Sequence, residues 1–342
     1  MPRISRKKKT YAIGEVLRSY LQDQARLTTV PITYQDLRRY NNTIPLYDKF
    51  NKDTLWVTVL YPQQDMDRIY YALKMIYSIL KADGDVSVME HLYVDRVDLC
   101  IYGNTRPFRI RIVNRINDNF DYFYIKHADA SRVYGLELEH MLSPNRISYL
   151  VADQTLIEEH IAGIPGDRFF EDQLHNGTHN LTRLAKEFVK FNERCFVRLL
   201  GDMHATNYVI DVTPDFDELH YRIRAIDFDQ QSYEGHKTIY MPQYFKQNNP
   251  IIQVGLKLMT SESVRQYQIE EHALMATRVR SSRHQVQHLM NAMTHDTLAP
   301  AENVAQLKRD LTDFYHSANF SRCRSMGEIV KASLEEVLRM KI

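Results

Sequence analysis

The sequence predicts an α+β protein with two lobes: a small lobe built on an antiparallel sheet, a large, mainly helical lobe, and an extra segment before them. Three observations support this class. The chain has 342 residues, enough for two domains. Its 44% hydrophobic and 25% charged residues are close to globular averages. Strand-like runs concentrate in residues 91–160 and helical patterns in residues 161–342, so the N-terminal segment comprises residues 1–90.

Residues 1–90 have a mixed, mainly helical pattern. A short β-prone run, LWVTVLY, lies at 55–61. Apolar residues then recur at helical spacing: Ile69, Leu73, Ile76 and Leu80. This stripe predicts a helix that packs on the core and ends at Asp83-Gly84.

The small lobe begins with three strand-like segments separated by turn residues. They lie at 91–102, 106–113 and 121–126, with turns at Gly103-Asn104 and at 117–119. Short strands joined by such turns predict a three-stranded antiparallel meander.

A helix at 131–142, stopped by Ser143-Pro144, and two strands at 147–151 and 155–160 complete the small lobe, and the lobes join near 163–166. The large lobe is expected to be loop-like from 230 to about 250. Its predicted helices and strands are 181–196, 208–212, 221–229, 261–294, 302–317 and 326–340.

Two short motifs carry the chemical information. Residues 201–207 read GDMHATN, and residues 226–229 read IDFD. Together they resemble the phosphotransferase signature of the aminoglycoside and choline kinase-like families. In those families a Gly-Asp-x-His-x-x-Asn loop precedes a hydrophobic-Asp-aromatic-acid strand end. The step from Asp202 to Asn207 also equals the Asp-to-Asn spacing of the protein kinase catalytic loop. The resemblance covers about residues 92–230.

The resemblance implies a bilobal kinase-like fold and a role for each matched residue. Asp202 would be the catalytic base that orients the acceptor hydroxyl. Asn207 and Asp227 would bind Mg²⁺ through hard oxygen atoms. His204 would hold the catalytic loop and its polar contacts together. Asp229 would either add a metal contact or cap the strand end.

A kinase also needs a cation for the nucleotide phosphates, usually a strand lysine held by a helix glutamate. Lys126 ends the third predicted strand, and the helix that follows offers Glu137 or Glu139, of which we choose Glu137. The resemblance also implies that the backbone of Glu158, Glu159 and His160 meets the adenine edge. ATP and Mg²⁺ are therefore the expected cofactors.

Three features depart from the family pattern. Leu200 stands where these families usually have His. The phosphate-covering loop at 102–107 has one glycine. Phe228-Asp229 replaces Phe-Gly, and neither Ala-Pro-Glu nor His-Arg-Asp occurs, which disfavours a conventional protein kinase. A small-molecule hydroxyl acceptor is therefore favoured. A cationic antibiotic is not indicated, because arginines offset the acids of the 261–294 segment.

Composition limits the partners. Lys plus Arg (44) nearly cancels Asp plus Glu (43), so no nucleic-acid surface is indicated, and the basic run at 6–9 is expected to be a solvated tail. No apolar stretch reaches the roughly 20 residues that span a bilayer. The three cysteines show no CxxC spacing, which is typical of a reducing cytoplasm and of buried thiols. The oligomeric state stays open.

The sequence thus predicts an ATP- and magnesium-dependent phosphotransferase that moves the γ-phosphate to a hydroxyl of a small molecule. Two alternatives stay open. The first is a catalytically weak pseudokinase or kinase-like scaffold, which Leu200 and the glycine-poor loop favour. The second is a kinase or nucleotidyl transferase that acts on a protein.

Overall fold

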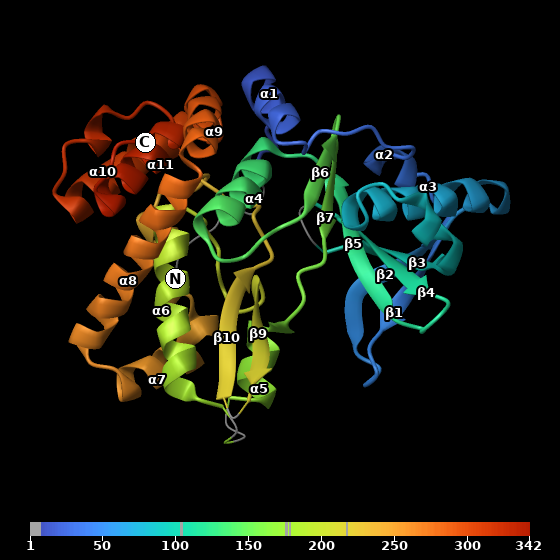
Figure 1. Ribbon diagram of the computed structural model, residues 1–342, viewed down its shortest axis with the longest axis horizontal. Coiled ribbons are helices and arrows are strands. Elements are labelled where there is room, and N and C mark those ends of the chain that lie inside the picture. The colour runs from blue at the N-terminus through green and yellow to red at the C-terminus, as the bar shows by residue number, and fades with distance from the viewer. Residues whose placement is uncertain (1–7, 103–104, 175–176, 178, 217) are drawn as a thin grey trace. The chain divides into compact units, whose positions relative to one another are not determined.

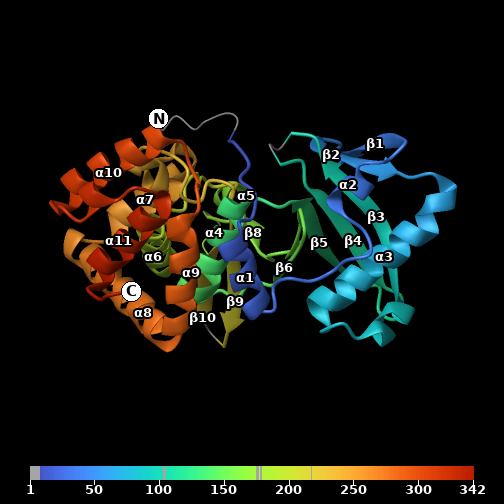
Figure 2. The same cartoon turned by 90° about the horizontal axis from the view of Figure 1, so that it is seen from above.

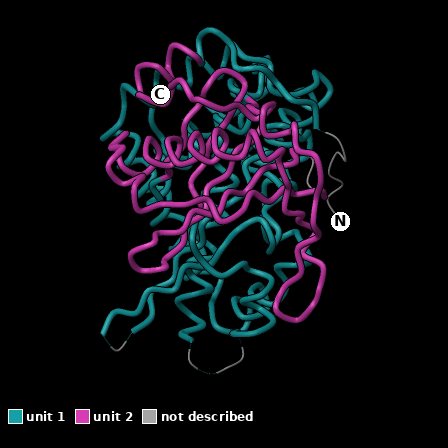
Figure 3. Tube along the Cα trace, turned by 90° about the vertical axis from the view of Figure 1, so that its right-hand side faces the viewer, with its two compact units in different colours: residues 1–17, 130–146, 161–342 teal, residues 18–129, 147–160 magenta. Residues whose placement is uncertain are grey.

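A computed structural model describes residues 8–102, 105–174, 177, 179–216 and 218–342. The protein is α+β, with a seven-stranded antiparallel sheet and many helices (Figure 1). The chain divides into two compact units, coloured separately in Figure 3. The smaller unit comprises residues 18–129 and 147–160, and the larger one comprises residues 1–17, 130–146 and 161–342. Helix α1 (Glu15–Asp23) contains the division between residues 17 and 18.

The smaller unit is built on the seven-stranded sheet, whose order is β1-β2-β3-β4-β5-β7-β6. The strands are β1 (Asn42–Tyr47), β2 (Asp53–Leu60), β3 (Leu92–Cys100), β4 (Phe108–Asn114), β5 (Phe120–His127), β6 (Tyr149–Ala152) and β7 (Thr155–Glu159). The predicted meander is confirmed as β3-β4-β5. Strands β1 and β2 come from the segment before residue 91, and β2 joins the sheet by pairing Trp56 with Cys100. That segment therefore supplies part of the sheet as well as helices.

The helix predicted in this segment is α3 (Gln63–Lys81), and Figure 2 shows it beside β3. Its stripe is buried in the sheet core at Ile69, Leu73 and Ile76, as expected. The chain leaves the helix through the left-handed region at Gly84, whose φ is 84° and whose N–H bonds the Ser78 carbonyl at 3.0 Å. The remaining elements of this unit are α2 (Tyr34–Leu37) and the 3₁₀ helix η1 (Val86–His91).

The larger unit holds a three-stranded sheet of order β10-β9-β8 and most of the helices. Its strands are β8 (Ile164–Pro165), β9 (Tyr208–Asp215) and β10 (Glu218–Ala225). Its α-helices are α4 (Ala130–Leu142), α5 (Gly166–Asp172), α6 (Leu181–Val197), α7 (Asn249–Leu258), α8 (Ser261–Ser281), α9 (Arg283–His295), α10 (Ala301–Tyr315) and α11 (Met326–Leu338). Its 3₁₀ helices are η2 (Lys237–Tyr240), η3 (Pro242–Tyr244), η4 (Lys246–Asn248) and η5 (Phe320–Arg322).

Several expectations for this unit need correction. The strand predicted at 221–229 is β10, which begins at Glu218 and ends at Ala225, so residues 226–229 lie beyond the strand. The single helix predicted at 261–294 is two helices, because the chain breaks at Ser282 between α8 and α9. Helix α7 was not predicted, because Pro250 suggested a loop. Proline has no N–H to donate and a fixed φ, so it fits the first turn of a helix, which is its position in α7.

Helix α11 packs closely on α9 (Figure 2). Gly327 permits this approach, since a Cβ atom there would lie 2.1 Å from the carbonyl oxygen of Met293. In the described part of the chain no helix is long and apolar enough to cross a membrane. The three cysteines are free thiols, and Cys195 and Cys323 are buried as expected, whereas Cys100 is only partly covered.

We expect Gly327→Ala to destabilise the protein by roughly 1–3 kcal/mol in urea unfolding, because the added methyl group meets backbone that cannot move away cheaply. Gly255→Ala in α7 is the matched control. There the new Cβ meets only the flexible end of Met259, so loss of the glycine entropy should stabilise the protein by about 0.5–1 kcal/mol. Equal effects of the two changes would contradict this account of the α9–α11 contact.

Candidate functional site

The GDMHATN loop follows α6 in the larger unit and is held mainly by its backbone. The N–H of Gly201 donates to the Gln230 carbonyl and the N–H of Asp202 to the Ile239 carbonyl, both at 3.1 Å. A Cβ at Gly201 would lie 3.1 Å from the Gln230 carbonyl oxygen, so the loop needs glycine there. Asp202 has a φ of 62°, in the left-handed region that side chains rarely adopt. Such strain persists only where surrounding contacts impose it, and it is common at functional sites.

The polar residues of the loop contact one another. The Asn207 side-chain amide donates to the Asp202 carbonyl at 2.8 Å and lies 3.3 Å from His204 Nε2. Thr206 Oγ1 lies 2.9 Å from His204 Nδ1. Burial lowers the pKa of His204, although Asp227 and Asp167 act in the opposite direction, so the imidazole is neutral near pH 7. These contacts support the role predicted for His204, which is to hold the loop together.

Asp202 has an unusual environment for a carboxylate. Its side chain is 19% exposed, and its Oδ1 lies 3.5 Å from His204 Nε2. Among the described residues this buried oxygen has no hydrogen-bond partner. Burial, followed by the nearby Asp227, Glu234 and Asp229 carboxylates, raises the pKa of Asp202 to about 7. A carboxyl group with this pKa can take up and release a proton near neutral pH.

The second motif ends in two acids that share one arginine. Arg132, in α4, places Nη1 2.9 Å from Asp227 Oδ1 and 2.6 Å from Asp229 Oδ1. The Asp229 N–H also donates to Asp227 Oδ1 at 2.9 Å. One guanidinium group therefore lies between the two acids and contacts both. The sequence does not identify Arg132 as a site residue, because one arginine in a predicted helix does not reveal which acids it will contact.

Helix α4 packs directly on Phe228, between these acids, and on Gln231, just after them. Ser131 Oγ donates to the Gln231 carbonyl at 2.6 Å. A Cβ at Gly135 would lie 3.0 Å from the Cβ of Phe228 and 3.2 Å from that of Gln231, so the small residue permits the approach. The position of α4 therefore sets the position of Arg132 against Asp227.

Gln231 supports the start of the GDMHATN loop, where Leu200 was expected to weaken it. Leu200 is buried and forms a β-bridge with Gln231. The Gln231 side-chain amide donates to the carbonyls of Arg198 and Leu199, at 2.5 and 3.2 Å, and lies 2.7 Å from Ser232 Oγ. The backbone just before the loop is thus hydrogen-bonded to a buried polar side chain, that of Gln231, which comes from another segment of the chain.

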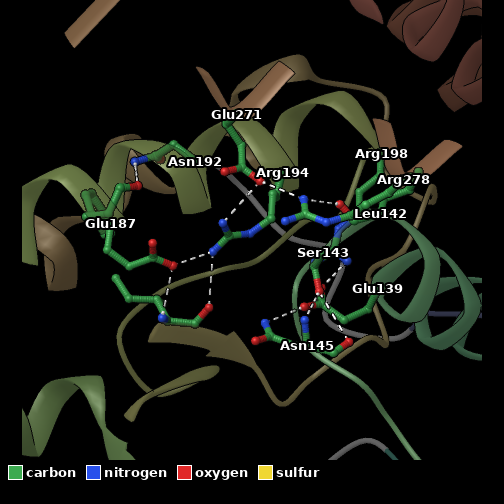
Figure 4. A network of polar contacts seen from close by, with 12 residues as sticks. Glu139, Leu142, Ser143, Asn145, Glu187, Asn192, Arg194, Arg198, Glu271 and Arg278 are labelled. Carbon is green, nitrogen blue, oxygen red and sulfur yellow. Dashed lines mark hydrogen bonds and ion pairs between the residues drawn. The ribbon is translucent and has the colours of Figure 1, made fainter. Parts of the chain in front are cut away.

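A buried network of ionic groups fixes the far end of α4 (Figure 4). Glu139 pairs with Arg198 and accepts a hydrogen bond from the Asn145 amide at 2.9 Å. Burial alone would raise the pKa of Glu139, but Arg198 and these hydrogen bonds outweigh it and lower the pKa. Arg194 of α6 lies 2.7 Å from Glu187 and 3.4 Å from Glu271 of α8. The network therefore joins α4, α6 and α8.

This network bears on the choice between Glu137 and Glu139 as the lysine partner. The Glu139 carboxylate is engaged by Arg198 and Asn145, so a pairing with Lys126 would compete with these contacts. In the smaller unit, Lys126 of β5 forms an ion pair with Glu158 of β7, with Nζ 3.0 Å from Oε2, and both side chains are buried. Lys126 and Glu137 belong to different units, and their pairing stays a prediction.

The predicted adenine edge lies at the end of β7. The N–H of Glu159 donates to the Ser148 carbonyl at 3.0 Å, and the N–H of His160 to the Tyr122 carbonyl at 3.3 Å. The His160 ring is also engaged, with Nδ1 3.2 Å from the Tyr124 hydroxyl. A nucleotide contact through these two N–H groups would compete with hydrogen bonds of the sheet, so that contact stays a prediction.

The predicted phosphate-covering loop lies only partly within the described residues. Gly103 and Asn104 are outside them, and Arg106 has a φ of 42°. In the described ranges no group of three or more His, Cys, Asp or Glu side chains is arranged to hold a metal ion. A magnesium site at the second motif would therefore need the Asn207 amide oxygen and backbone, water or phosphate oxygens beside its carboxylates.

No protein-family model matches the chain, and no curated protein sequence matches it. The resemblance to the aminoglycoside and choline kinase-like families therefore rests on the motif residues.

The pKa of Asp202 predicts how a substitution will affect stability. Between pH 4 and 7 the unfolded chain loses the Asp202 proton while the folded chain keeps it, so the group stabilises the fold below pH 4 and this contribution is lost as pH rises towards 7. Asp202→Asn removes this loss. Urea unfolding should show the variant gaining up to roughly 4 kcal/mol relative to wild type between pH 4 and pH 8.

Asp313→Asn, at an exposed position of α10, shows the effect of removing one surface charge. A stability difference between Asp202→Asn and wild type that does not change with pH would contradict the raised pKa.

We expect Gln231→Ala to lower the free energy of unfolding by about 1–3 kcal/mol, because the Arg198 carbonyl loses its side-chain donor, whereas the Leu199 carbonyl still accepts from the Ser232 N–H at 2.8 Å. Gln247→Ala, at an exposed position of η4, should change it by less than about 0.5 kcal/mol. Urea midpoints of the two variants make the comparison. A Gln231→Ala protein as stable as the control would show that the amide does not support the loop.

Proposed function

We propose that the protein is a kinase-like phosphotransferase with a bilobal arrangement, of the aminoglycoside and choline kinase-like class. It would move the γ-phosphate of ATP to a hydroxyl of a small molecule, with Mg²⁺. The observation that carries the proposal is the setting of Asp202. Its carboxyl group is largely buried on a strained backbone, with Asn207 bound to the same loop and Asp227 close enough to raise its pKa.

Asp202 suits the role of the base. A general base works best when its pKa lies near the operating pH, and the pKa of Asp202 is raised to about 7. Its Oδ1 is buried and has no hydrogen-bond partner among the described residues, while the side chain as a whole is 19% exposed, so an acceptor hydroxyl would approach the carboxyl group from its exposed side. The left-handed backbone and the amide of Asn207 would hold the carboxyl group while the proton moves.

The donor set fits Mg²⁺. Asn207 uses its side-chain nitrogen towards Asp202 and His204, which leaves the amide oxygen outside those contacts. Asp227 uses Oδ1 towards Arg132 and the Asp229 N–H, and its side chain is 37% exposed. Asn207 Oδ1 and Asp227 Oδ2 would therefore hold the ion. When bound, the ion supplies positive charge that offsets the charge of the phosphates.

The other predicted residues complete the proposal. Lys126 would contact the nucleotide phosphates with Glu137 as its helix partner, and residues 158–160 would lie at the adenine edge. The motif departures favour a small-molecule acceptor over a protein. The free thiols support a reducing, cytoplasmic setting.

The scaffold alternative is favoured by one observation. Arg132 occupies one oxygen of each acid in the second motif, which reduces the negative charge that would attract metal ions. A protein of this kind would bind nucleotide or a partner without turnover. The protein-directed kinase or nucleotidyl transferase is distinguished by transfer of label from ATP to a protein, including this chain.

A thermal-shift titration with ATP, with and without Mg²⁺, tests the proposal without knowledge of the acceptor. The midpoint of the wild type should rise with ATP only when Mg²⁺ is present, and Asp227→Ala should abolish that rise because it removes a metal ligand. Asp202→Asn should keep the rise. In any assay that detects wild-type turnover, the same variant should lose about 10²- to 10⁴-fold in rate.

Asp211→Asn, a change in β9 outside both motifs, is the control. No rise in the wild type would support the scaffold that does not use ATP. Equal loss of binding in Asp227→Ala and Asp202→Asn would contradict the division of roles between metal ligand and base.

A further inference from the structure

The guanidinium of Arg132 bridges the two acids of the second motif through one nitrogen atom. Nη1 lies 2.9 Å from Asp227 Oδ1 and 2.6 Å from Asp229 Oδ1. Distances of this kind are those of charge-assisted hydrogen bonds. A single positive atom thus lies between one oxygen from each carboxylate, which is the arrangement that a bridging metal ion has between two acids.

The bridge is buried and permanent. The Arg132 side chain is 2% exposed, its Nη2 lies 3.5 Å from the Ile226 carbonyl, and its guanidinium carbon lies 5.9 Å from the centre of the Phe228 ring. Arginine stays protonated at any pH that a folded protein tolerates. To leave, the buried guanidinium would have to abandon its ion pairs with two partly exposed acids, which would leave a buried charge unpaired.

The surrounding charges explain why a cation is needed here. The carboxylates of Asp227, Asp229 and Glu234 are near enough to raise the pKa of Asp202. On the same segment, Lys8 donates a hydrogen bond from Nζ to the backbone carbonyl of Asp229. Without Arg132, one oxygen of Asp227 and one of Asp229 would lose the guanidinium that lies between them.

We propose that Arg132 takes the place of a second metal ion, so that the site binds one Mg²⁺ with the nucleotide. The inference rests on the proposed function. Protein kinases place two magnesium ions against the acid of the corresponding motif and the catalytic-loop Asn. Here Asp227 Oδ1 and Asp229 Oδ1 are held by the chain itself. The oxygens left for an ion are Asp227 Oδ2 and Asn207 Oδ1.

The number of bound ions tests the inference. Mn²⁺, a paramagnetic substitute for Mg²⁺, is titrated into the full chain with the non-hydrolysable analogue adenylyl imidodiphosphate, and free Mn²⁺ is counted by electron paramagnetic resonance. The analogue alone gives the background. We expect one Mn²⁺ per wild-type chain. Arg132→Met removes the charge at similar length and should bind two, because the guanidinium no longer occupies the position between the two acids.

Two further variants serve as controls. Arg132→Lys keeps a positive charge and should bind one Mn²⁺. Arg132→Met combined with Asp229→Asn removes one of the bridging acids and should also bind one. Circular dichroism and the unfolding temperature of each variant show whether it is folded.

The outcomes separate the two proposals. Two Mn²⁺ per wild-type chain would overturn the role of Arg132 however the variants fold, and would leave the phosphotransferase proposal in place. One Mn²⁺ in a folded Arg132→Met protein would also overturn it. No Mn²⁺ bound to the wild type beyond the analogue background would overturn the proposed function itself, and this inference with it.

Discussion

The contact between helix α4 and residues 228–231, at the end of the second motif and just after it, is the constraint on which the site depends. Gly135 allows the close approach to Phe228, and Ser131 bonds the Gln231 carbonyl. This approach brings the Arg132 guanidinium between two carboxylates. A buried charge is tolerated only when it is paired, so the acids and the arginine fix one another. A shift of α4 would separate the Arg132 guanidinium from Asp227 and Asp229 and leave a buried charge unpaired. The helix and the two acids therefore hold each other in position.

The same crowding of carboxylates gives Asp202 its chemistry. With like charges close by and little solvent, the charged form of Asp202 is disfavoured, and its pKa rises to about 7. One arginine removes part of the repulsion at Asp227 and Asp229. The arrangement thus combines a carboxyl group that can exchange a proton near neutral pH with two acids that are paired with one guanidinium group.

Two buried polar systems keep this geometry in place. The Gln231 amide donates to the carbonyls of Arg198 and Leu199 just before the GDMHATN loop. Arg198 then pairs with Glu139 at the far end of α4. The loop, α4 and the acidic segment are therefore linked by side chains that lose a partner if any one of them moves, which makes the larger unit a preorganised frame for the site.

From the sequence alone, local patterns determined most of the elements and the two motifs. The meander, α3 and α6 follow from hydrophobic periodicity and turn residues, and the GDMHATN loop brings Asp202, His204 and Asn207 together because they are close along the chain. The break at Ser282 and helix α7 were missed, because local composition does not separate two helices in a continuous polar stretch or reveal that a proline begins one. The partners of Arg132, Gln231 and Glu139 lie roughly 30 to 100 positions away along the chain, so only the tertiary structure decided them. A buried charge takes whichever opposite charge the fold brings to it, and no local pattern records that choice.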